Sequence, residues 1–217
     1  MTADQILALT VFAAVSSGTP GPNNLMLMTS GVNFGMKRSV PHLLGITLGF
    51  CFMIFAVGMG LQTMFAVIPQ LETVLRYVGT AYLLWLAWKI ANSGPISSGS
   101  GDGKYSGAKP TGFWAAAAFQ WVNPKAWFMA ISAITTYASS AANEEMGSKL
   151  SQVLLVVLIF GAINFPLVAC WGLFGSAMRR FLQDPKILKI FNVTMAILLV
   201  ASLYPIVYPI VQPMFQA

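Results

Sequence analysis

Long stretches without a single charged residue constrain this 217-residue chain more than any other feature of its sequence. A helix needs about 20 apolar residues to cross the roughly 30 Å of hydrocarbon in a bilayer. Four charge-free stretches are longer than that, over residues 5–36, 43–71, 150–178 and 190–217. Charged residues make up only 8% of the chain, whereas a soluble domain carries about 25%. The sequence therefore predicts an all-α integral membrane protein.

Two further spans complete an expected set of six transmembrane helices. Residues 73–91 carry charge only at Arg76 and Lys89, whose apolar stems can lie in the membrane while their charged groups reach opposite interfaces. Residues 111–137 are interrupted by one charge, Lys125. Six spans are therefore predicted, three on each side of the longest connection.

That connection, residues 92–110, is rich in glycine and serine, a composition typical of a flexible linker. It separates a first three-helix repeat in residues 1–91 from a second in residues 111–217. Because each half has an odd number of spans, the second half enters the membrane from the opposite side. The sequence thus predicts two inverted repeats, an arrangement found in many secondary transporters.

Basic residues are distributed unevenly between the two sides of the membrane. Nine lie on or beside the first, third and fifth connections, and only two lie on the other side. Basic loops favour the cytoplasm, so we expect a cytoplasmic linker and two periplasmic termini. The nine residues are Lys37, Arg38, Lys89, Lys104, Lys109, Arg179, Arg180, Lys186 and Lys189.

The remaining polar and reactive residues argue against other classes of protein. The net charge of +6 comes from residues that flank apolar runs, so no nucleic-acid partner is expected. Cys51 and Cys170 both lie inside apolar runs and are predicted to be small buried hydrophobes, without a disulfide or a metal. His42 follows the basic pair of the first connection and is predicted to be interfacial. No cofactor is expected.

The sequence TPGPNN, residues 19–24, interrupts the first span. Its two prolines lack backbone donors and disfavour helix at the residues before them. We therefore expect the helix to stop near Gly18 and to restart with Pro22 in its first turn. The restart leaves backbone N–H groups at the positive end of a half-helix, which is suited to binding a carboxylate.

A second break is predicted in the fourth span, at QWVNPKAW from Gln120. Asn123 can cap a helix that starts at Pro124. Lys125 is then a charge inside the membrane, near a positive helix end, and this costly position indicates a function. The alternative is a side chain that extends to the outer interface. The predicted substrate-binding residues are Pro20, Gly21, Pro22, Asn23, Asn24, Asn123, Pro124, Lys125 and Asn164, the last in a GAINFP sequence whose Pro166 is expected to kink the helix.

Together these motifs resemble the LysE/RhtB family of amino acid exporters. Besides TPGPNN and FQWVNPKAW, the resemblance rests on GVNFGMKRS, LLGITLGF and YVGTAYLLWLAWKIA. The first half is more similar to the cysteine and O-acetylserine exporter branch than to the lysine and arginine branch. Phe50 stands where many family members carry an acidic residue, which argues against a cation-recognising pocket. The resemblance implies proton-driven export of small amino acids or derivatives across a bacterial inner membrane.

Other functions fit the sequence less well. An intramembrane enzyme needs an acid, base or nucleophile within its spans, and Lys125 is the only charge there. A metal transporter needs several converging carboxylate, histidine or cysteine ligands. A channel or a structural membrane subunit without carrier activity stays open as the alternative, as does a homo-oligomer.

Overall fold

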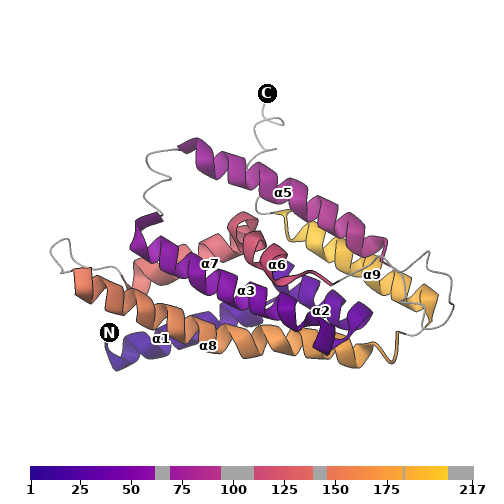
Figure 1. Cartoon of the computed structure of the whole chain (residues 1–217), viewed down its shortest axis with the longest axis horizontal. Coiled ribbons are helices and arrows are strands. Elements are labelled where there is room, and N and C mark those ends of the chain that lie inside the picture. Colours follow the sequence, from indigo (N-terminus) through magenta and orange to yellow (C-terminus); the bar gives the residue numbers. More distant parts are fainter. Residues whose placement is uncertain (62–68, 94–109, 139–145, 183, 205–217) are drawn as a thin grey trace.

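The computed structural model describes residues 1–61, 69–93, 110–138, 146–182 and 184–204 (Figure 1). Every regular element within them is helical, which confirms the all-α prediction for this part of the chain. Most of the linker predicted over residues 92–110 lies outside the described residues. The elements are α1 (Ala3–Gly18), α2 (Pro22–Phe34), α3 (Met36–Ala56), η1 (Val57–Leu61), α5 (Pro69–Ala91), α6 (Phe113–Phe119), η2 (Gln120–Val122), α7 (Pro124–Tyr137), α8 (Met146–Met178) and α9 (Pro185–Ala201).

Local capping sets several of these helix ends. At the start of α1, the side chain of Thr2 accepts from the backbone of Gln5 and the Gln5 side chain accepts from the backbone of Thr2. This reciprocal pair satisfies two donors that a helix start leaves free. At α9, the Asp184 carboxylate accepts from the backbone of Lys186 and Ile187, and a proline occupies the first helical position. These helices therefore start where their sequences provide a side-chain acceptor.

The longest helix, α8, organises the packing of the others. It runs beside α1 and then beside α2, so the two short helices lie one after the other along it (Figure 1). Helix α3 packs between α8 and α6, while α5 and α9 form a separate pair. The two halves of the chain are thus packed against each other along most of their length.

Glycines permit the closest of these helix contacts. A Cβ added at Gly31 of α2 would collide with the backbone oxygen of Gly172 in α8. A Cβ at Gly45 of α3 would collide with the backbone oxygen of Phe113 in α6. Small residues of this kind let helix backbones approach closely where apolar burial cannot drive association. Gly35 has a different role, because its φ of 80° turns the chain between α2 and α3.

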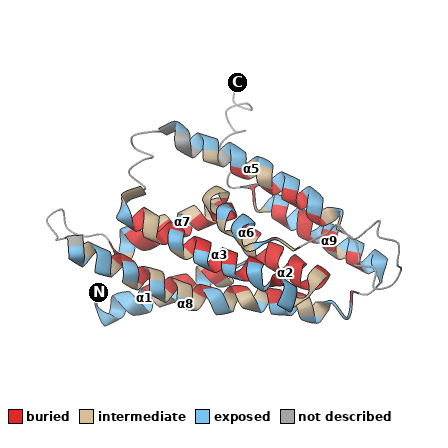
Figure 2. Ribbon diagram, in the orientation of Figure 1, coloured by how far each residue is buried: buried red, intermediate tan, exposed pale blue. Residues whose placement is uncertain are grey.

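Apolar side chains cover the outer faces of the helices as well as the core. On α1, Leu7, Val11 and Val15 follow one another at four-residue spacing and are all more than half exposed. Figure 2 shows such exposed faces around a buried centre. Within the described residues, two helical stretches, Met36–Leu61 and Gly147–Met178, are long and apolar enough to cross a membrane. An apolar outer surface of this kind is suited to contact with lipid.

The structure corrects two expectations about single residues. His42 is not an exposed side chain of the first connection: it sits inside α3 and is 1% exposed. Within the described part of the chain, neither of its ring nitrogens has a hydrogen-bond partner. Cys170 is exposed on α8 and is not buried, whereas Cys51 is partly buried. In both cases the apolar run was visible in the sequence, but the face that packs inward was not.

Candidate functional site

A pocket lies where the chain leaves α1 and enters α2. The three residues between these helices, 19–21, are not helical. The pocket measures about 330 Å³ with its open mouth included. The enclosed space within it is only about 20 Å³, room for about one water molecule. The side chains of the protein therefore nearly fill the pocket in this structure.

The carbonyl groups at the end of α1 receive donors from side chains. The Asn24 amide donates to the backbone oxygens of Ser17 and Thr19, both at 2.8 Å. The indole of Trp171, on α8, donates to the oxygen of Gly18 at 3.3 Å. A helix end leaves its last carbonyls without intrahelical donors, and in lipid no water replaces them. These side chains therefore supply donors to the last carbonyl groups of the helix.

Lys125, the second residue of α7, supplies a further donor to the same helix end. Its Nζ donates to the backbone oxygen of Thr19 at 2.9 Å, to the Thr19 hydroxyl at 3.0 Å and to the backbone oxygen of Pro20 at 3.3 Å. The side chain thus reaches across to the first break and not to the outer interface. The ammonium thus lies away from the positive start of α7 and beside the negative end of α1, a position that stabilises a cation.

Gly21 leaves the space that this lysine occupies. A Cβ at Gly21 would lie 2.8 Å from Cδ and 3.0 Å from Nζ of Lys125. The φ of Gly21 is −174°, an extended conformation open to any residue. The glycine therefore provides space for the lysine in this position and is not required for backbone freedom.

Amide side chains connect the first break to the second. Asn23 donates to the Oε1 atom of Gln120 at 2.8 Å, and Gln120 donates back to the Oδ1 atom of Asn23 at 3.1 Å. Asn123 is the N-cap of α7, and its side chain accepts from the backbone N–H of Lys125 at 3.1 Å. These bonds hold the start of α2 beside the start of α7.

Asn164 joins the site from α8. Its amide donates to the hydroxyl of Ser17 at 3.0 Å, and its Oδ1 accepts from Thr47 at 3.4 Å. Helix α8 continues without interruption past Pro166. Asn164 therefore contributes to the pocket from an unbroken helix.

Most of the predicted site residues meet in this pocket. Gly21, Asn23, Asn24, Asn123, Lys125 and Asn164 line it, whereas Pro20, Pro22 and Pro124 set the helix ends around it without lining it. Six further lining residues were not among the predicted site residues, although Phe50 had been noted for its position in the family. These are Ser16, Ser17, Phe50, Ala126, Met129 and Val168. For the two serines a signal existed, because they occupy the last turn of a helix predicted to stop near Gly18.

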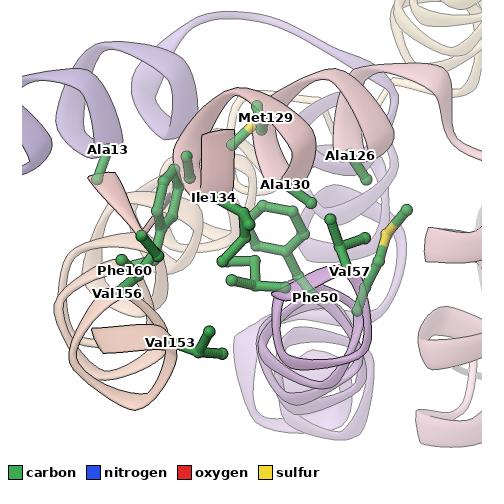
Figure 3. Close-up of a cluster of buried hydrophobic side chains, with 14 of the residues drawn as sticks. Ala13, Phe50, Val57, Ala126, Met129, Ala130, Ile134, Val153, Val156 and Phe160 are labelled. Carbon is green, nitrogen blue, oxygen red and sulfur yellow. The ribbon is translucent and has the colours of Figure 1, made fainter. Parts of the chain in front are cut away.

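One wall of the pocket is apolar and continuous with the largest buried cluster. Figure 3 shows Phe50, Ala126 and Met129 among the side chains of that cluster. The other lining residues contribute amides, hydroxyls and the ammonium of Lys125. The described residues that line the pocket include no carboxylate and no group of metal ligands. The lining thus combines apolar side chains with neutral hydrogen-bonding groups and one cation.

The start of α2 adds donors to the polar wall. The first turn of a helix has backbone N–H groups without intrahelical acceptors, and here these belong to Asn23 and Asn24. They lie at the positive end of α2, and both residues line the same pocket as Lys125. A helix N-terminus and an ammonium are both groups that attract a carboxylate. Interrupted helices with a site between them are a feature of many membrane transporters.

Comparison with known proteins agrees with this class. The model of the LysE type translocator family matches residues 14–202. The cysteine/O-acetylserine efflux protein of Escherichia coli (strain K12) is 32% identical over 204 residues, covering 92% of this chain and 96% of that protein. The protein of the same name from Klebsiella pneumoniae is 31% identical over 180 residues, covering 83% and 86%. No solved structure matches the chain.

The chain belongs to the LysE family of translocators, and the resemblance seen in its motifs is confirmed. The match extends over both halves and includes both proline-containing sequences. Membership of this family identifies the chain as a transporter and not an enzyme.

Proposed function

We propose that the protein is a secondary transporter that exports small neutral amino acids or derivatives, such as cysteine or O-acetylserine, across a bacterial inner membrane, driven by the proton gradient. The observation that carries the proposal is the pocket at the first break, where unpaired helix N–H groups and the Lys125 ammonium meet an apolar wall. Support for the substrate class comes from the two relatives, which are named for cysteine and O-acetylserine efflux.

The pocket favours a neutral amino acid for reasons of charge. Its carboxylate would lie between the N–H groups at the start of α2 and the ammonium of Lys125. Its side chain would contact Phe50 and Met129 on the apolar wall. A cationic side chain would find no carboxylate among the described lining residues, and burying an unpaired charge costs several kcal/mol. Lysine and arginine are therefore expected to be poor substrates.

The transporter is proposed to have six spans in two inverted repeats. In such a repeat the first span is related to the fourth, and the third to the sixth. The helix pairs support this relation, because the break after α1 contacts the start of α7, and α5 packs along α9. The basic connections are proposed to face the cytoplasm and both termini the periplasm. Labelling of a Ser100→Cys variant from outside intact cells would contradict this orientation.

Export by inverted membrane vesicles tests the proposed function. Vesicles containing the protein are expected to take up cysteine and O-acetylserine when a proton gradient is present. Uptake should fall when the gradient is collapsed, and lysine should serve as a non-transported control. Uptake that is unaffected by an uncoupler would contradict proton coupling. Counterflow distinguishes a carrier from a channel. In a carrier, unlabelled substrate on one side of the membrane accelerates the uptake of labelled substrate from the other side, whereas in a channel it does not.

A further inference from the structure

The ammonium of Lys125 is fully engaged in this structure, although the proposed function requires it to bind a carboxylate. An ammonium has three N–H donors. The three oxygens that accept from Lys125 are the backbone oxygens of Thr19 and Pro20 and the hydroxyl of Thr19. We refer to these three oxygens as the carbonyl cradle. All three belong to neutral groups, so the cradle solvates a cation without neutralising it.

The carbonyl cradle has the features of a binding site for a primary ammonium. It lies just past the end of α1, where the helix dipole is negative. Gly21 keeps its entrance open, because a Cβ there would lie 3.0 Å from Nζ. The Asn24 amide, bonded to Thr19 and Ser17, fixes the position of the backbone that forms it.

We propose that Lys125 occupies the place of the substrate's α-ammonium, and that substrate binding exchanges one for the other. The incoming ammonium takes the carbonyl cradle, and the displaced Lys125 ammonium pairs with the carboxylate of the same substrate. This proposal deepens the proposed function and rests on it, because it assumes an amino acid as the ligand.

Charge balance explains why the exchange is favourable. The empty site holds one cation, Lys125, on the carbonyl cradle. The occupied site holds the substrate ammonium on the cradle and an ion pair between Lys125 and the carboxylate. The ammonium and the carboxylate of an α-amino acid are attached to a single carbon, so Lys125 moves only to an adjacent position. Both states hold one cation on the cradle, and in the occupied state the Lys125 ammonium and the carboxylate pair with each other, so neither of these two charges is left without a partner.

The exchange also makes the site selective for molecules that carry both groups. An amine without a carboxylate must compete with a lysine that is tethered next to the cradle, which gives Lys125 a high effective concentration. A carboxylate without an amine draws Lys125 away and leaves the cradle without a cation. Both partial ligands are expected to bind poorly to the unmodified protein.

Binding of three matched compounds to the purified full-length protein, with a reductant present, tests the exchange. Cysteine carries both groups, cysteamine lacks the carboxylate, and 3-mercaptopropionate lacks the ammonium. In the unmodified protein, cysteine should bind at least tenfold more tightly than either partial compound. In Lys125→Met, cysteine binding should fall at least tenfold. Cysteamine binding should rise at least tenfold, because the cradle is vacant and one cation replaces another.

The opposite response of cysteamine and cysteine separates the exchange from a general defect. If cysteamine binding falls together with that of cysteine, or does not change, the exchange is wrong. If Lys125→Met does not fold, Lys125→Ala serves the same purpose, since it vacates the cradle and leaves more room. Adding Thr19→Val to either variant should reduce cysteamine binding severalfold, because the hydroxyl of the cradle is lost. If Thr19→Val leaves cysteamine binding unchanged, the amine does not bind at the carbonyl cradle, and the proposal is wrong.

The same measurements distinguish this inference from the proposed function. Failure of cysteine and O-acetylserine to bind or to be exported by the unmodified protein would contradict the proposed substrates. Normal binding of cysteine together with a parallel loss of both ligands in Lys125→Met would contradict only the exchange.

Discussion

The two proline-containing breaks differ in how their free backbone groups are satisfied. At the second break a single residue, Asn123, separates η2 from α7 and caps α7 through its own side chain. At the first break three residues are non-helical, and two of the donors come from distant parts of the chain. These donors are Lys125 and Trp171, more than a hundred residues away from the carbonyls they reach.

This difference shows that the first break depends on the second half of the chain. A cap formed by a neighbouring residue survives when helices shift, because donor and acceptor move together. The oxygens of Thr19 and Pro20 instead accept from Lys125 of α7. Any separation of α1 from α7 therefore removes this donor and leaves Thr19 only the Asn24 amide. In lipid such groups must find another donor. A substrate ammonium is one such donor, and this gives a physical reason for placing the binding site at the first break.

The largest effect is expected from closing the space between the two breaks. Gly21→Leu places a side chain where Lys125 now lies, and should abolish export while the protein is still inserted. Gly21→Ala should reduce export substantially, because its Cβ already meets the lysine. Gly18→Ala is the matched control, since a Cβ there has no atom within 4 Å. Normal export by a correctly inserted Gly21→Leu protein would show that the TPGPNN sequence only bends the chain.

Removal of the charge that joins the breaks should have the next largest effect. Lys125→Met keeps most of the side-chain length and should weaken binding of O-acetylserine at least tenfold, which corresponds to about 1.4 kcal/mol. Lys125→Arg should retain partial function because it keeps the charge. Calorimetry on purified protein measures both. If Lys125→Met binds and exports normally, the lysine has no part in substrate recognition.

A smaller effect is expected at the locally capped break. Asn123→Ala removes the N-cap of α7 and should lower stability by about 1 kcal/mol, as the loss of a cap usually does. Asn123→Asp keeps an acceptor and should preserve most of that stability. Thermal unfolding in detergent compares the two variants. Equal stability of Asn123→Ala and the unmodified protein would mean that the second break is not held by its cap.

The sequence predicts features that depend on neighbouring residues. The prolines predicted that one helix stops near Gly18 and that the next starts with Pro22 in its first turn. In the structure α1 ends at Gly18 and α2 begins at Pro22. The cap of α7 followed from Asn123 and Pro124 in the same way. Six of the nine residues predicted for the site line one pocket, because both breaks were recognised as unusual.

Features that depend on distant contacts could not be predicted in this way. Lys125 donates to Thr19, which is 106 residues away in the sequence. No local sequence pattern links these two residues. The burial of His42 follows from which face of α3 turns inward, and the basic residues before it suggested the opposite. Phe50 and Met129 belong to apolar runs in which lipid-facing and pocket-facing residues look alike.

The central claim is that substrate binds in the pocket at the first break, and protection of a single thiol tests it most directly. Ser16→Cys lines this pocket and can be introduced into a Cys51→Ala and Cys170→Ala background, with Ala3→Cys as an exposed control. The account predicts that O-acetylserine slows maleimide labelling of Ser16→Cys but not of Ala3→Cys, and that Lys125→Met removes this protection. Labelling of Ser16→Cys at an unchanged rate, in a protein that still exports O-acetylserine, would contradict the account.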